Sequence, residues 1–140
     1  DRDQIRAVAA GVCSVATPNS YYFIRMASGE DAADRAIAEK VRLAFPSLDG
    51  QGTHVNISGA GVVRNAPNRD NAIRLLEFFT SAASQTHIAA MNNEYPVSPD
   101  VPAPPPVDAW ARFTAHPMGV ATFARHQPEA QSVMSAAGWR

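Results

Sequence analysis

The chain of 140 residues is long enough for one ordinary domain, and its composition is that of a folded protein. Apolar residues make up 46% and charged residues 18% of the sequence, which excludes intrinsic disorder. The formal net charge of −1 excludes a protein that binds nucleic acid through a broadly basic surface. No apolar run approaches the roughly 20 residues of a membrane-spanning helix. The single cysteine, Cys13, excludes an internal disulfide framework.

The first part of the chain predicts helices that alternate with short strands. Helical patterns cover residues 1–10, 21–27 and 30–41, and short apolar runs at 12–17 and 43–45 are typical of buried strands. The opening residues are polar and helix-forming, so we expect no signal peptide among them. Strands that alternate with helices indicate an α/β fold.

The second part begins with an extended segment, Thr53 to Val63, which Gly59 and Gly61 interrupt. The best helical pattern follows, from Asn71 to Thr80, and a second helix is expected from Ala82 to Met91. Five of the 11 prolines fall at 99–107 and predict an extended, semi-rigid connector. Short helices are expected to finish the chain, around residues 110, 120–125 and 129–137.

Tyr21 and Tyr22 are the most informative candidates for a binding site, because they follow a predicted strand and open a predicted helix. Neighbouring residues in the first turn of a helix lie about 100° apart, so both hydroxyls can converge on one point. Free backbone N–H groups and the helix dipole there favour anions, including a phenolate. Two phenolate oxygens suit a hard, oxidised iron ion better than a soft metal, and metal binding drives proton release from its ligands.

A simpler interpretation of these tyrosines stays open at this point. A pair of tyrosines after a strand most often packs against neighbours, with its hydroxyls hydrogen-bonded or hydrated. From the pattern alone, this packing role is favoured over a metal site, because the spacing contains nothing specific to a metal.

No motif supports catalysis, and we expect no enzyme. The four histidines are scattered without the spacing of a zinc hydrolase, although the role of His54, in the glycine-interrupted segment, stays open. The Ser58 to Gly61 run lacks the remainder of a phosphate-binding loop, and no nucleophile elbow occurs. Glu94 and Tyr95 place a carboxylate and a phenol together, but a turn before Pro96 explains them equally well.

Six segments, taken in order, cover nearly the whole chain and together are specific. They are IRAVAAG (5–11), NSYY (19–22), GTHVNISGAGVV (52–63), APNRDNAIRLLEFF (66–79), NEYPV (93–97) and QPEAQ (127–131). In this combination the chain resembles the bacterial periplasmic ferric-iron-binding proteins, which are the solute-binding components of iron ABC transporters.

The resemblance implies part of a two-lobed, type II periplasmic-binding-protein fold of the α/β class. Residues 1–58 would form part of the carboxy-terminal lobe and end in a hinge strand, 59–97 would belong to the amino-terminal lobe, and 98–140 would return to the first. Tyr21 and Tyr22 match the adjacent tyrosines that coordinate Fe³⁺ in the family, and Asn19 matches a residue that helps to hold a synergistic anion, carbonate or phosphate. Ser20 and His54 are weaker candidates for supporting residues.

The resemblance also implies a function in iron uptake. Fe³⁺ would be captured in a closing cleft in the periplasm and delivered to a membrane permease, with no nucleic acid involved. Family members are about twice as long as this chain, so we expect a carboxy-terminal fragment with half a site. The helices at 71–91 would then expose an apolar face that pairs with the missing part or with a second copy.

Two alternatives remain at this stage. One is a related solute-binding protein for another small anion or a polyamine. The other is a structural or interaction fragment that binds no ligand and in which the tyrosines pack.

Overall fold

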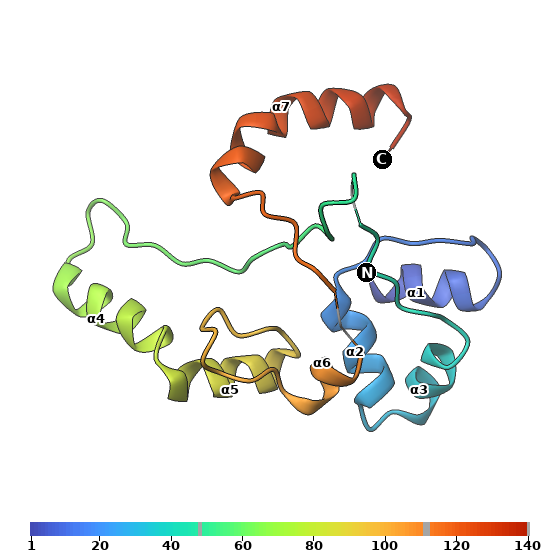
Figure 1. Cartoon of the computed structure of the whole chain (residues 1–140), viewed down its shortest axis with the longest axis horizontal. Coiled ribbons are helices and arrows are strands. Elements are labelled where there is room, and N and C mark those ends of the chain that lie inside the picture. Colours follow the sequence, from blue (N-terminus) through green and yellow to red (C-terminus); the bar gives the residue numbers. More distant parts are fainter. Residues whose placement is uncertain (48, 111–112, 140) are drawn as a thin grey trace. The chain divides into compact units, whose positions relative to one another are not determined.

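The computed structural model describes residues 1–47, 49–110 and 113–139 (Figure 1). Within them the chain forms seven helices: α1 (Arg2–Ala9), α2 (Ser20–Ser28), α3 (Ala32–Ala38), α4 (Arg69–Phe79), α5 (Ala82–Asn92), α6 (Pro105–Trp110) and α7 (Val120–Ala136). The chain divides into two compact units. The first unit comprises Asp1–Ala44 with Ser58–Arg112, and the second comprises Phe45–Ile57 with Phe113–Arg140.

The core of the first unit forms around α2, which contacts α1, α3 and α6 (Figure 1). Phe23, Ile24 and Met26 of α2 are buried against single residues of the three neighbouring helices, Ile5, Ala38 and Val107. Burial of a large apolar side chain contributes about 1.5–3 kcal/mol. This cluster therefore fixes α2, and with it the tyrosines of its first turn.

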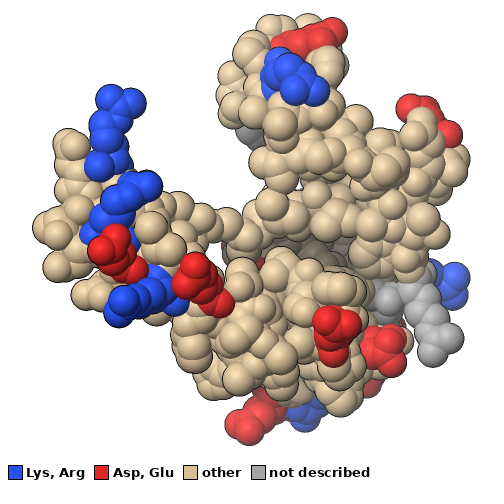
Figure 2. Space-filling model, turned by 60° about the vertical axis from the view of Figure 1, so that its left-hand side comes forward, with Lys and Arg blue, Asp and Glu red and all other residues tan. Residues whose placement is uncertain are grey.

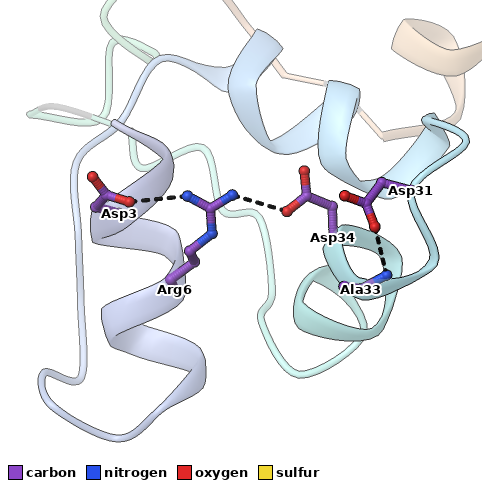
Figure 3. Close-up of polar contacts among 5 residues, drawn as sticks. All are labelled: Asp3, Arg6, Asp31, Ala33 and Asp34. Atoms are coloured by element: carbon purple, nitrogen blue, oxygen red, sulfur yellow. Dashed lines mark hydrogen bonds and ion pairs between the residues drawn. The ribbon is translucent and has the colours of Figure 1, made fainter.

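Polar contacts tie the surrounding helices together. The Arg6 guanidinium of α1 contacts Asp3 of the same helix at 2.9 Å and Asp34 of α3 at 3.0 Å (Figure 3). Asp31 caps α3 by accepting a 2.8 Å hydrogen bond from the N–H of Ala33 (Figure 3). Arg6 thus joins two helices that also pack on α2.

The side chain of Gln85 forms a polar clamp, which we define as its two hydrogen bonds to backbone groups that flank α5. This buried amide donates to the carbonyl of Phe79 at 2.7 Å and accepts from the N–H of Val97 at 2.8 Å. Because both partners are backbone groups, one side chain joins the end of α4 to the segment that follows α5. The sequence pattern predicted both helices almost to the residue.

Helix α4 has no buried residue, so the exposed apolar face expected for the helices at 71–91 is present on α4, whereas α5 buries Ser84, Gln85 and Ala89. Leu75 and Phe78 are 51% and 58% exposed. Its charged side chains are exposed as well: Arg69, Asp70, Arg74 and Glu77. Figure 2 shows basic and acidic groups side by side on one part of the surface.

The second unit is held together by an isolated parallel bridge between Thr53 and Ala115. The N–H of Thr53 donates to the carbonyl of Thr114, and the N–H of His116 donates to the carbonyl of Thr53, both at 2.8 Å. Phe45 stacks on Phe113 with ring centroids 4.6 Å apart. Gly52 makes this close approach possible, as a Cβ there would lie 2.5 Å from the Thr114 carbonyl oxygen.

The strands expected at 12–17, 43–45 and 53–63 are not formed, because the described residues contain no β-strand beyond that single bridge. Val12 and Val15, expected in a buried strand, are 78% and 79% exposed. A strand requires a neighbour with which to exchange backbone hydrogen bonds. The described part of the chain supplies no such neighbour to these extended segments.

The helix expected around residue 110 is formed by α6, but two other expectations near the end of the chain, a connector and a pair of helices, were wrong. The proline-rich connector expected at 99–107 gives way to α6 at Pro105, because proline fits the first turn of a helix, where its missing N–H costs nothing. The two helices expected at 120–125 and 129–137 form one helix, α7, which runs through Pro128. Every residue around that proline is exposed, so water can satisfy the backbone carbonyl that it leaves unpaired. None of the described helices combines the length and apolar character required to cross a membrane.

Candidate metal centre

The start of α2 positions Asn19, Ser20, Tyr21 and Tyr22. Asn19 is the N-cap residue, with an extended backbone (φ −66°, ψ 139°), and its carbonyl accepts a 3.2 Å hydrogen bond from the N–H of Tyr22. Its side chain makes no capping hydrogen bond to the helix backbone. The side chain of Asn19 instead hydrogen-bonds the phenol of Tyr21.

The rings of Tyr21 and Tyr22 lie together. Their centroids are 4.4 Å apart and their planes are tilted by 37°. Both residues are half-buried, and Tyr22 also packs against the core cluster that surrounds α2. The core thus fixes the Tyr22 ring, and the Tyr21 ring lies against it.

The hydrogen bond with Tyr22, which holds the proton on Tyr21, is the largest of the effects that raise the pKa of Tyr21 above its ordinary value, followed by desolvation. The charge of a neighbouring phenolate acts in the same direction, since two adjacent oxyanions repel each other. A hydrogen bond from the side chain of Asn19 opposes this rise, because it stabilises the phenolate of Tyr21. Tyr21 therefore stays protonated at neutral pH unless a cation replaces its proton.

The structure adds Glu94 to the groups that raise the pKa of Tyr21. This half-buried carboxylate accepts a hydrogen bond from the hydroxyl of Ser58, with Oγ and Oε1 3.3 Å apart, and its charge contributes to the raised pKa of Tyr21. The sequence pattern identified Glu94 as a carboxylate beside Tyr95 and Pro96, but it did not indicate an effect on Tyr21. The neighbouring Tyr95 belongs to different surroundings, where desolvation and the charge of Asp108 raise its pKa.

The weaker candidates fall in different places. Ser20 is the first residue of α2, directly before the tyrosines. His54 belongs to the second unit, where its ring meets Phe123 edge-on with centroids 4.9 Å apart. The structure therefore groups Asn19 and Ser20 with the tyrosines in one unit and assigns His54 to the other.

The described residues contain no group of three or more His, Cys, Asp or Glu side chains that could hold a metal ion. A metal site in this part of the chain therefore requires other ligands, such as the phenols. An open cavity of about 450 Å³ at the start of α4, lined by residues between Ala66 and Arg74, contains none of the predicted ligands. The donors that meet at Tyr21 are instead its own phenol, that of Tyr22 and the amide of Asn19. Such an oxygen-rich set fits Fe³⁺, a hard ion, better than a soft or borderline metal.

Residues 12–115 match the family model of the bacterial extracellular solute-binding proteins. The chain belongs to this family. A close relative is iron uptake protein A2 of Synechocystis sp. (strain ATCC 27184 / PCC 6803 / Kazusa), which is 47% identical over 142 aligned residues that include all of this chain and 41% of the relative. Iron uptake protein A1 of the same organism is 39% identical over all of this chain and 39% of its own length.

The solved structures agree with this assignment. A Trichodesmium protein (IdiA, FutA) in complex with iron and citrate has a TM-score of 0.93 and 40% sequence identity, over all of this chain and 44% of its own. The expected fold class, part of a type II solute-binding fold, is thereby confirmed at the level of the family, although the strands expected in this chain are absent from its described residues. The chain spans about two fifths of the length of the relatives that it matches.

Proposed function

We propose that this chain is part of a ferric-iron-binding protein that captures Fe³⁺ and delivers it to an ABC permease. The single observation that carries the proposal is the paired arrangement of Tyr21 and Tyr22, with centroids 4.4 Å apart in the first turn of α2. The relatives support it through their names, which are those of iron uptake proteins, and through the iron and citrate bound to the Trichodesmium protein. The proposed activity is binding and release, without catalysis.

In this proposal Tyr21 and Tyr22 supply two phenolate oxygens to the ion. Asn19 helps to hold a synergistic anion, carbonate or phosphate, through its amide, which makes no capping hydrogen bond. Ser20 lies beside these ligands, and His54 stays a candidate for a supporting role when the lobes close. The remaining ligands would come from polypeptide outside this chain, and the protein would act in the periplasm.

The lobe assignment of the sequence analysis is part of the same proposal. Residues 1–58 and 98–140 would belong to one lobe and 59–97 to the other. Closure of two lobes around an ion is a hinge motion, so the metal would shift an equilibrium between open and closed forms.

The exposed apolar residues of α4 also require an explanation in this proposal. Leu75 and Phe78 are more than half exposed, and an apolar patch of this kind is typical of a surface that another polypeptide covers. Because the relatives are more than twice as long as the matched region, we assign this role to the rest of the two-lobed protein. The chain alone is then expected to self-associate, and Leu75→Ser combined with Phe78→Ser to reduce this in analytical ultracentrifugation. A chain that is already monomeric at high concentration would contradict the assignment.

The test of iron binding uses the purified chain and ferric citrate. Tyrosinate coordinated to Fe³⁺ gives a visible charge-transfer band, and we expect this band to appear in proportion to the iron bound. Tyr21→Phe with Tyr22→Phe should abolish it, whereas Tyr95→Phe should leave it unchanged. No band in the unmodified chain, with iron present in excess, would count against the proposal.

A further inference from the structure

The chain passes from the second unit into the first between Ile57 and Ser58. It also crosses between the units directly before Phe45 and directly before Phe113. The rings of these two phenylalanines stack on each other, so both of those crossings lead to one fixed point. The course of the chain at Ser58 depends instead on polar contacts on either side of the crossing.

On the side of the second unit, the crossing segment starts from Thr53. This buried residue makes two backbone hydrogen bonds of 2.8 Å, one to the carbonyl of Thr114 and one from the N–H of His116. The ring of the next residue, His54, lies edge-on against Phe123. The segment therefore leaves the second unit from a fixed start.

On the side of the first unit, Glu94 holds Ser58. The Ser58 hydroxyl donates to the carboxylate of Glu94, 36 residues away in sequence, with Oγ and Oε1 3.3 Å apart. Glu94 is itself placed by the end of α5, where Asn93 adopts the left-handed conformation (φ 57°, ψ 41°) and the N–H of Glu94 donates to the carbonyl of Ala89 at 3.2 Å. The crossing segment thus ends on a residue whose partner is positioned by a helix.

The chain directly after Ser58 has little to hold it. A Cβ added at Gly59 or Gly61 would meet no atom within 4 Å, and no described residue accepts a hydrogen bond from the N–H groups of 59–62. Such a lack of contacts is typical of mobile segments. Without the contact at Ser58, the unheld chain would run from residue 55 to residue 62 instead of 55 to 57, and its maximum reach would rise from about 14 Å to about 30 Å.

We propose that the hydrogen bond between Ser58 and Glu94 is a tether that limits the flexible part of this crossing to residues 55–57. The tether thereby sets how much slack this link between the two units contains. Its bearing on lobe closure rests on the proposed function, because closure is a hinge motion and a longer flexible link restrains such a motion less. The tether itself depends only on the contacts of Thr53, Ser58 and Glu94.

The test is ¹⁵N relaxation, which gives a backbone order parameter for each residue on the picosecond-to-nanosecond timescale. Within residues 53–63 of the unmodified chain, we expect values below about 0.6 only at 55–57, with recovery at Ser58. Ser58→Ala and Glu94→Ala should both extend the low values through residue 62. Glu94→Gln keeps an acceptor oxygen and should retain the pattern of the unmodified chain. Thr86→Ala removes a hydroxyl hydrogen bond within α5 and is the matched control, with no change expected at 59–62.

Equal order parameters at 59–62 in Ser58→Ala and Thr86→Ala would overturn the proposal, and so would low values at 59–62 in the unmodified chain. If Glu94→Ala fails to fold, as judged by circular dichroism, the exposed Ser58→Ala variant decides the question alone. The measurement requires no iron. Its failure is therefore distinct from a failure of the proposed iron binding, which the charge-transfer band reports.

Discussion

Tyr21 and Tyr22 lie with their ring centroids 4.4 Å apart at the start of a helix whose other face forms the core of the first unit. The apolar residues of α2 and the two phenols therefore depend on the same nine-residue helix. Burial of Phe23 and Ile24 orients the first turn, and this turn places both hydroxyl-bearing rings together. Packing and binding are thus two consequences of one local sequence.

The first prediction concerns ionisation of Tyr21. Tyr22→Phe should lower the pKa of Tyr21 toward its ordinary value, because the hydrogen bond with Tyr22, which holds the proton on Tyr21, is the largest of the effects that raise it. Asn19→Ala should raise it further, since the Asn19 hydrogen bond stabilises the phenolate. Ultraviolet titration of the tyrosinate absorbance measures both changes. Equal titration curves for the two variants would contradict this account.

The same shifts predict how stability depends on pH. Tyr21 and Tyr95 both have raised pKa values in the folded chain, so above about pH 10 the unfolded chain loses these protons first. The free energy of unfolding should therefore fall as the pH rises above this value, whereas near neutral pH the contribution of these groups is fully present and does not vary with pH. Urea unfolding at a series of alkaline pH values measures the effect, with Tyr95→Phe as the variant that reduces it.

Gln85→Ala should destabilise the first unit by about 2 kcal/mol, because it leaves the Phe79 carbonyl and the Val97 N–H without their partner. Chemical denaturation measures this loss. Gln131→Ala, on the exposed surface of α7, is the matched control and should change stability by less than about 0.5 kcal/mol. Similar losses in the two variants would show that the clamp contributes nothing specific.

Gly52→Ala should disrupt the second unit. At Gly52 (φ 128°) an added Cβ would lie within 2.5 Å of the Thr114 carbonyl oxygen, so the strain should cost about 1–3 kcal/mol and break the bridge between Thr53 and Ala115. Amide hydrogen exchange at Thr53 and His116 reports that bridge. Gly59→Ala, where an added Cβ meets no atom within 4 Å, should leave the exchange rates unchanged.

Local patterns predicted the helices better than the strands. The apolar spacing of Ile73, Leu76 and Phe79 identified α4, and the expected second helix matches α5, because helix formation depends mainly on neighbours in sequence. The run at 12–17 has strand composition, but a strand depends on hydrogen bonds to distant chain, which the described residues do not provide. Pro105 and Pro128 lie in helices where the sequence pattern predicted none. Helices accept proline in the first turn and, where solvent satisfies the backbone, further along.

The candidate site was only partly accessible from the sequence. Adjacency in sequence was sufficient to place Tyr21, Tyr22 and Asn19 together in one helical turn. The charge of Glu94 contributes to the raised pKa of Tyr21 although the two residues are far apart in sequence, and no spacing rule expresses such an effect. The hydrogen bond between Ser58 and Glu94 joins residues 36 positions apart, and the sequence pattern could not predict it either.

The most direct test of the central claim is the visible absorption spectrum of the chain titrated with ferric citrate, compared with the variant Tyr21→Phe, Tyr22→Phe. The account predicts a tyrosinate-to-iron band that saturates in the unmodified chain and is absent from the variant. Bound iron with the same spectrum in both proteins would contradict it.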